Sequence, residues 1–173
     1  MSKTINERVH AKFEGDFVVF VIGMRINKLW KIHKWFPVFL AMPKMIIELS
    51  KNPESGFLGA RNAGFWLVQY WRSFDHLVAY ARTRDAKHFP AWVKFNKRVG
   101  TSGDVGIWHE TYLVRAGEYE TLYVNMPPSG FGKIGSLSNA KGLYNTAQGR
   151  AGKSEYNDAP VTSEGNVVRE QPL

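Results

Sequence analysis

The chain has 173 residues and a mass of 19.7 kDa, and its 44% hydrophobic content is ample for the core of a single domain. It contains no cysteine, which excludes disulfides, thiolate metal sites and cysteine nucleophiles. The formal net charge of +8 favours anionic partners, but no nucleic-acid motif accompanies it, so we expect a solvated basic surface and no specific nucleic-acid partner.

No signal-peptide pattern opens the sequence, and no apolar run reaches the length of a transmembrane segment. We therefore expect a soluble, cytoplasmic protein. The basic and aromatic stretch 27–35 could suit a membrane surface, but it also fits a loop and helix start that pack on the body. The apolar run that follows favours the second interpretation.

Hydrophobic patterning and turn residues predict a regular succession of elements through the first hundred residues. In chain order these are a strand at 16–25, a helix at 36–49, strands at 56–61 and 65–71, a helix capped by Ser73 that runs to about 82, and a helical piece at 90–98.

Residues 105–126 are predicted to form two strands joined by a turn at 115–118, because a glycine interrupts two β-rich runs. Neither face of this hairpin is simply polar, so both faces are expected to be buried. Alternation along the first strand places the neighbouring side chains of His109 and Glu110 on opposite faces.

The order strand, helix, strand, strand, helix, strand, with one extra C-terminal strand, predicts a ferredoxin-like βαββαβ domain of the α+β class over residues 1–135. Its helices cover one sheet face, and the other apolar face needs a cover, most simply a second copy of the chain. A homodimer that forms an α+β barrel follows. Residues 136–173 are rich in Gly, Ser, Asn and Ala, and are expected to form an extended or mobile tail.

Chemistry is expected in an apolar cavity with few polar groups. His109 could be a general base, an oxygen-directing group or a haem ligand, or it could form a structural pair with Glu110. His88, and less favourably His76, could be the axial ligand of haem b, or ordinary helix residues. The remaining candidates are Tyr112 beside the catalytic pair, and Arg72, Trp92, Tyr123 and Asn125 for substrate binding.

Other chemistries lack their motifs: the sequence has no metal-chelating spacing, no phosphate-binding loop with a following lysine and no nucleophile elbow. Hydrolases, kinases and dinucleotide enzymes are therefore disfavoured.

Several motifs carry a resemblance to a known group. The run Tyr70-Trp71-Arg72-Ser73, followed by Leu77, His88 and Trp92, resembles the antibiotic-biosynthesis monooxygenase group. The stretches 56–59, 106–112 and 123–127 look like one little-characterised family, described as monooxygenase-like after a fungal fumagillin-pathway member. This resemblance spans roughly residues 16–132.

The resemblance implies a dimeric α+β barrel, and such barrels include cofactor-free oxygenases, haem-degrading monooxygenases, chlorite dismutases and haem-dependent aldoxime dehydratases. Three hypotheses follow. The first is a small oxygenase or related oxidoreductase that acts on an apolar small molecule with no cofactor. The second is a haem enzyme of the monooxygenase, dehydratase or peroxidase type. The third is a non-catalytic dimeric protein that binds a small molecule.

Overall fold

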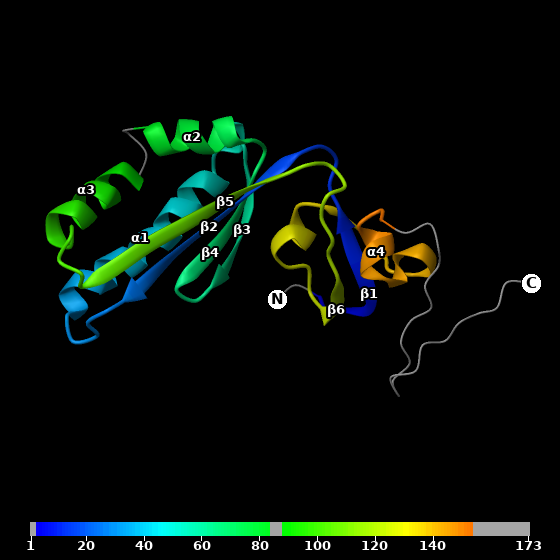
Figure 1. Ribbon diagram of the computed structural model, residues 1–173, viewed down its shortest axis with the longest axis horizontal. Helices are drawn as coiled ribbons and strands as arrows, with labels where there is room; N and C mark the ends of the chain where they lie inside the picture. The colour runs from blue at the N-terminus through cyan, green and yellow to red at the C-terminus, as the bar shows by residue number, and fades with distance from the viewer. Residues whose placement is uncertain (1–2, 84–87, 154–173) are drawn as a thin grey trace, which may run out of the picture. The chain divides into compact units, whose positions relative to one another are not determined.

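The computed structural model describes residues 3–83 and 88–153 (Figure 1). Contacts within the chain group the residues into two compact units, one formed by 16–113 and the other by 1–15 together with 114–173. We call the first the helix-covered unit and the second the three-stranded unit. The boundaries of the helix-covered unit differ from the 1–135 expected for the ferredoxin-like domain.

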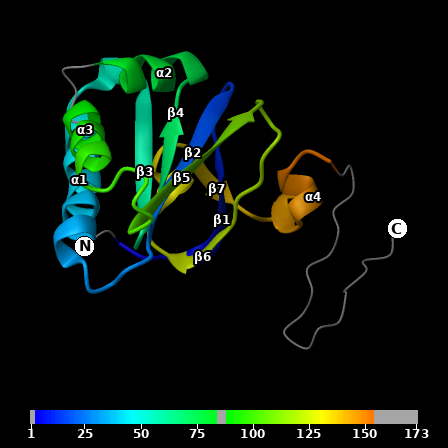
Figure 2. The same ribbon diagram turned by 60° about the vertical axis from the view of Figure 1, so that its left-hand side comes forward.

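The helix-covered unit has the predicted βαββαβ order. Its elements are β2 (Phe17–Ile26), α1 (Ile32–Ser50), β3 (Phe57–Ala63), β4 (Trp66–Trp71), α2 (Phe74–Arg82), α3 (His88–Arg98) and β5 (Val105–Val114), with a 3-10 turn at Pro53–Ser55. The strands lie in the order β3-β4-β2-β5, and β4 is antiparallel to both β2 and β3. Figure 2 shows the three helices on one side of this sheet. The ferredoxin-like α+β prediction is confirmed.

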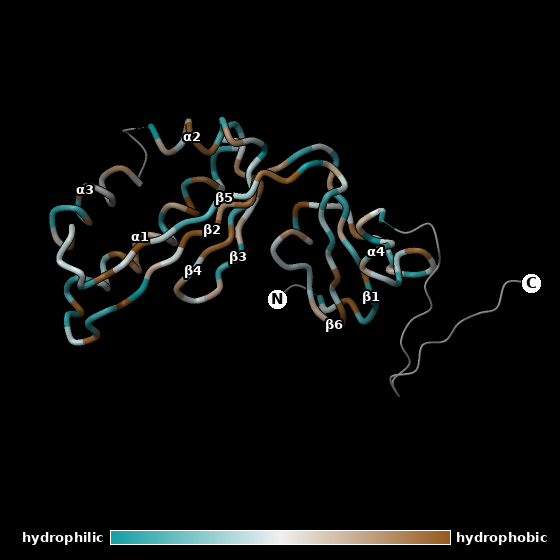
Figure 3. Tube along the Cα trace, viewed as in Figure 1, coloured by the Kyte–Doolittle hydropathy of each residue, from teal (hydrophilic) through white to brown (hydrophobic). Residues whose placement is uncertain are grey.

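Alternation along β2 builds the core of this unit. Val18 stands opposite Trp71 of β4 in the antiparallel register, and both pack with Leu49 and Leu77 from the helices. Trp71 is completely buried, and its indole N–H donates to the side-chain oxygen of Gln69 at 3.0 Å. Figure 3 shows hydrophobic residues along β2 and β4, as strands under a helical layer require.

The start of α2 is the predicted one. Ser73 has an extended backbone, and its hydroxyl accepts from the backbone N–H of His76 at 3.3 Å. Among the described residues, no helix is long and apolar enough to cross a bilayer.

The three-stranded unit contains β1 (Ile5–Lys12), β6 (Tyr123–Met126) and β7 (Ser136–Asn139) in the order β6-β1-β7, with both pairs antiparallel. A short helical turn at Gly130–Lys133 lies between β6 and β7, and two more, Gly142–Asn145 and α4 (Ala147–Arg150), follow β7. Strand β1 was not predicted, because its sequence INERVHAK has polar residues on both faces of one half.

The predicted hairpin at 105–126 is wrong, although its turn is present. The N–H of Glu118 donates to the carbonyl of Arg115 at 3.0 Å, but β5 belongs to the four-stranded sheet and β6 pairs with β1. Residues 119–122 form no strand. Instead the hydroxyl of Thr121 accepts from the backbone N–H of Ala11 in β1 at 2.8 Å, and the hydroxyl of Tyr119 accepts from the N–H of Phe13, just after β1, at 2.6 Å. Alternation alone cannot identify the partner of a strand.

Residues 136–150 form regular structure where composition predicts an extended or mobile tail. Strand β7 pairs with β1 from Val9 opposite Asn139 to Lys12 opposite Ser136. A short polar strand has no periodicity that distinguishes it from a loop. Residues 154–173 of the expected tail lie outside the described residues.

Candidate functional site: an apolar pocket beneath helix α1

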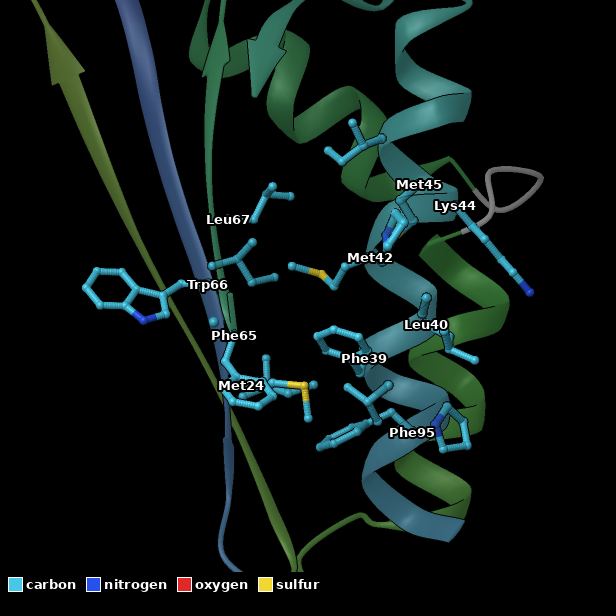
Figure 4. Close-up of a pocket in the computed structure, with 18 of the residues that line it drawn as sticks. Met24, Phe39, Leu40, Met42, Lys44, Met45, Phe65, Trp66, Leu67 and Phe95 are labelled. Carbon is cyan, nitrogen blue, oxygen red and sulfur yellow. The ribbon is translucent and has the colours of Figure 1, made fainter. Parts of the chain in front are cut away.

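A pocket of about 860 Å³ lies in the helix-covered unit between α1, α3 and the strands. This volume is in the range typical of small-molecule sites. Figure 4 shows Phe39 and Met42 directed from α1 toward the strands, at the level of Met24 and Leu67. Phe95 of α3 contributes to the same lining.

The pocket lining is flexible as well as apolar. Three of the five methionines in the chain, Met24, Met42 and Met45, line it. Methionine has an unbranched, polarisable side chain that adapts to irregular shapes, so these walls can conform to ligands of different outline. The site is therefore suited to apolar molecules of varied shape.

Few polar groups reach this pocket. Lys34, Lys44, Asn62 and Lys94 are among the lining residues, and the described lining includes no acidic side chain and no histidine. The ammonium of Lys34 is held by Asp104 at 2.8 Å, and Figure 4 shows that of Lys44 directed away from the cavity. The lining can hold an apolar ligand and exclude water, and its described residues include no carboxylate or imidazole to act as a general acid or base.

Three lysines converge on one carboxylate near the start of α1. Asp104 is 1% exposed, and the ammonium groups of Lys28 and Lys31 lie 2.9 Å from its Oδ1, beside that of Lys34. Hydrogen bonds from Lys28, Lys34 and Lys31 hold the pKa of the Asp104 carboxyl well below its usual range. Three cations and one anion leave a net charge of about +2 at this point.

The structure separates the two residues predicted at mid-β5. His109 lies on the helix-covered face, with its ring 5.4 Å from that of Phe20, which packs on the core there. It is two residues from Ile107, which lines the pocket, but His109 is exposed and is not itself part of the lining. Glu110 and Tyr112 lie on the opposite face, where the Tyr112 hydroxyl donates to Glu110 at 2.5 Å and this bond raises the pKa of Tyr112.

The other predicted site residues do not gather around the pocket lining. Arg72 is exposed after β4, and its backbone N–H donates to the carbonyl of Gly56 at 2.8 Å. The His76 ring lies 2.7 Å from the Ser73 hydroxyl and stands directly over Gly56, which has a φ of +73°. Any side chain at Gly56 would therefore be strained and would meet this ring.

Four further candidates have different locations. Tyr123 and Asn125 belong to β6, in the three-stranded unit, and Asn125 has a left-handed backbone with a φ of 51°. His88 and Trp92 belong to α3, and their side chains lie outside the described residues.

Haem was the alternative cofactor, and the side chain of its predicted ligand, His88, lies outside the described residues. The described lining includes no imidazole, although it includes methionines, whose thioether can also ligate haem iron. His76 is engaged with Ser73 on α2, away from this lining. Within the described part of the chain, no group of three or more His, Asp or Glu side chains is placed to hold a metal ion.

Sequence reasoning missed the residues that form this pocket, because they read as ordinary core residues of α1 and the strands. One signal was available: α1 has only His33, Lys34, Lys44 and Glu48 as titratable residues among its 19, and its apolar residues extend around most of the helix. A helix of that kind on one face of a sheet has more apolar surface than the sheet alone can cover.

Comparison with solved structures gives the class of fold. An aldoxime dehydratase in complex with butyraldoxime matches with a TM-score of 0.61 and 15% identity, over 78% of this chain and 44% of that one. A second aldoxime dehydratase structure matches with a TM-score of 0.50 and 17% identity, over 77% and 39% of the two chains. These similarities show an α+β fold of the ferredoxin-like barrel type.

The family follows from the sequence. The chain belongs to the Monooxygenase af470-like family, whose model matches residues 17–131. It is similar to Monooxygenase af470 of Aspergillus fumigatus, with 28% identity over 129 residues that cover 66% of this chain and 45% of that protein. The chain thus spans less than half the length of each of these relatives.

Proposed function

We propose that this protein is an oxidoreductase of the oxygenase type that binds an apolar small molecule in the pocket beneath α1. The observation that carries the proposal is the pocket itself, about 860 Å³ in volume and lined by flexible apolar side chains. Membership of a family named after a monooxygenase supports the reaction class.

In the reaction that we propose, the substrate supplies its own electrons. Oxidation of an activated methylene group by one molecule of dioxygen, which gives a ketone and one molecule of water, balances without a further reductant. The substrate loses four electrons, one oxygen atom enters the carbonyl and the other leaves as water with the two methylene hydrogens. The protein has to bind the substrate, exclude bulk water and remove the first proton.

His109 is the proposed base for that proton. It shares a sheet face with Ile107 of the pocket and lies against Phe20. A ligand that extends past Ile107 along β5 would reach the imidazole. Glu110 and Tyr112 face away from the pocket, so we assign them no direct contact with this ligand.

The homodimer also stays a proposal. Trp66 and Trp108 lie on the sheet face away from the helices, with their ring centroids 6.0 Å apart. The two residues are 53% and 36% exposed. The Trp108 indole packs directly against Gly23, because a Cβ atom on residue 23 would lie only 2.6 Å from it. Exposed aromatic residues of this kind are typical of an interface.

Oxygen uptake with anthrone as the probe substrate tests the proposed function. Wild-type protein should consume oxygen and form anthraquinone faster than buffer alone. Ala60→Phe fills the pocket from β3 and should lower the rate by about tenfold or more, the scale of a lost binding site. Ala63→Phe is the matched control, because Ala63 ends the same strand, is exposed and is not among the lining residues.

His109→Ala separates chemistry from binding. It should abolish uptake while anthrone still quenches tryptophan fluorescence with unchanged affinity. Quenching that Ala60→Phe removes, without any oxygen uptake by wild-type protein, would establish a binding protein and reject the enzyme. Absence of both signals would reject the pocket as an anthrone site. An absorption spectrum of untagged protein with added haemin tests the haem alternative through a Soret band.

A further inference from the structure

We propose that α1 and the loop before it dock on the surface of an anionic lipid bilayer. The surface consists of loop residues 28–31 and the exposed apolar side of α1 to residue 47, and we call it the basic apolar edge. This inference does not depend on the proposed reaction. It rests on large apolar side chains that are exposed to solvent in this fold.

The apolar part of the edge is continuous along the helix. Leu29 is 68% and Trp30 is 74% exposed, and both precede α1. On the helix the exposed apolar residues are Ile32, Phe36, Leu40 and Ile47. At about 100° per residue, these four fall within an arc of about 80°, so they form one exposed stripe along one side of α1.

This stripe borders the apolar face that α1 directs to the strands. That face includes Phe39 and Met42, which point toward the strands and the pocket (Figure 4). A surface helix normally carries polar residues on its outer face, and an extended exposed apolar patch marks an interaction site. Phe36, Leu40 and Ile47 also line the pocket, so the exposed stripe and the pocket mouth are continuous.

The charge of the edge favours anionic lipid as the occupant. Residues 17–47 include no aspartate or glutamate, but they include Arg25, Lys28, Lys31, Lys34 and Lys44. Asp104 neutralises only one of the three lysines that it binds. A second copy placed on this surface would bring the same cations together, whereas anionic headgroups would neutralise them.

The loop is held in a shape that suits insertion. The indole N–H of Trp35 donates to the carbonyl of Leu29 at 3.0 Å, and the carbonyl of Asp104 accepts from the N–H groups of Asn27 and Lys28. The lysine ammoniums turn inward to Asp104, while Leu29 and Trp30 are exposed. On a bilayer, the side chains of Leu29 and Trp30 would enter the boundary of the acyl chains, and the lysine ammoniums would lie near the headgroups. Because the loop is already held by hydrogen bonds, binding would cost little conformational entropy.

Sedimentation with vesicles tests the docking. Vesicles of phosphatidylcholine with about 30% phosphatidylglycerol should bind the protein about tenfold or more tightly than phosphatidylcholine alone, because lysines add to the apolar contact. Leu29→Ser should weaken this binding about tenfold, as expected when one leucine no longer enters the bilayer. Leu113→Ser is the matched control, since Leu113 is also 68% exposed but lies at the end of β5, and it should change nothing.

A second pair isolates the charge. Lys44→Gln on the exposed side of α1 should weaken binding to the anionic vesicles about fivefold, the effect of one lysine near such a surface. Lys141→Gln, an equal change at an exposed residue of the three-stranded unit, should leave binding unchanged.

Three results would overturn the proposal. One is no sedimentation with either vesicle, and another is equal weakening by Leu29→Ser and Leu113→Ser. The third is concentration-dependent self-association of the wild-type protein that Leu29→Ser removes, without vesicle binding, which would assign this surface to a second copy of the chain.

Discussion

The two units of this chain are stabilised by different means. The helix-covered unit buries a cluster of large apolar side chains around Trp71, with Val18, Leu49 and Leu77. The three-stranded unit buries few large apolar residues among those described, with Phe131 the largest, and it also buries His10. Its first strand is instead bonded by the side chains of Tyr119 and Thr121.

The difference shows which unit of the chain can hold a ligand-binding pocket. A unit with a sheet and three helices has enough apolar surface to form a core and still leave a pocket of about 860 Å³ unfilled. The three-stranded unit has no such surplus in its described residues, and polar bonds at defined positions hold it. We therefore expect function in the helix-covered unit, and we expect the two units to respond to different mutations.

The largest effect should come from Trp71→Ala. Removing a fully buried indole should destabilise the helix-covered unit by about 3–5 kcal/mol, because a cavity replaces its contacts. All six tryptophans of the chain lie within residues 16–113, so tryptophan fluorescence during urea unfolding reports this unit. Hydrogen exchange at β1 reports the other unit and should change much less.

Trp71→Phe is the graded control for this variant, since it keeps an aromatic ring against Phe57 and Tyr80 and loses only the hydrogen bond to Gln69 and part of the volume. A loss below about 1 kcal/mol in Trp71→Ala would contradict the view that this cluster holds the unit. Equal acceleration of exchange at β1 would show instead that the two units unfold together.

The sequence predicts the helix-covered unit because its elements have clear periods. Strand β2 reads as an apolar run, α2 has a serine cap, and the intervening turns carry Gly, Pro and Asn. These local signals are sufficient to predict the βαββαβ order. They cannot predict the pocket, since the same apolar residues on α1 would fit a filled core equally well.

The three-stranded unit could not be predicted from the sequence, and the reason is physical. Its bonds join residues more than a hundred positions apart, such as Phe13 to Tyr119, and they use hydroxyl groups that have no period. For the same reason the sequence does not predict the lysine cluster around Asp104, because Asp104 lies 70 or more positions from these lysines along the chain. The predicted role of His109 depends on a ligand, so it stays a prediction.

A smaller effect should come from Tyr119→Phe in the three-stranded unit. The hydroxyl accepts from the N–H of Phe13 and donates to its carbonyl at 3.1 Å, so its removal should cost about 1 kcal/mol of unfolding free energy. The ring keeps its edge contact with Phe131. Hydrogen exchange at Phe13 should accelerate while tryptophan fluorescence unfolding stays unchanged.

The matched control is Tyr112→Phe, which removes an exposed hydroxyl from the helix-covered unit and should change stability by less than about 0.5 kcal/mol. If Tyr119→Phe were as neutral as this control, the bond between the hydroxyl and the Phe13 backbone would not stabilise the three-stranded unit.

The smallest effect should be a pH dependence confined to the same unit. His10 is 1% exposed and stacks on Tyr144 at 4.5 Å, and its Nε2 atom has no hydrogen-bond partner among the described residues. Burial, followed by the charges of Lys12 and Arg150, lowers the pKa of His10 below 6.5, although Glu120 opposes this shift. The unfolded chain then binds the proton more readily, so His10 contributes stability above pH 6.5 that is lost as the pH falls below it.

Hydrogen exchange at β1 should therefore accelerate by about two- to tenfold as the pH is lowered from about 7.5 to about 5.5, after correction for intrinsic exchange rates. His10→Phe keeps the stacking and should remove this acceleration, whereas His33→Phe on the exposed side of α1 should retain it. The same acceleration in His10→Phe would mean that another group carries the pH dependence of the three-stranded unit.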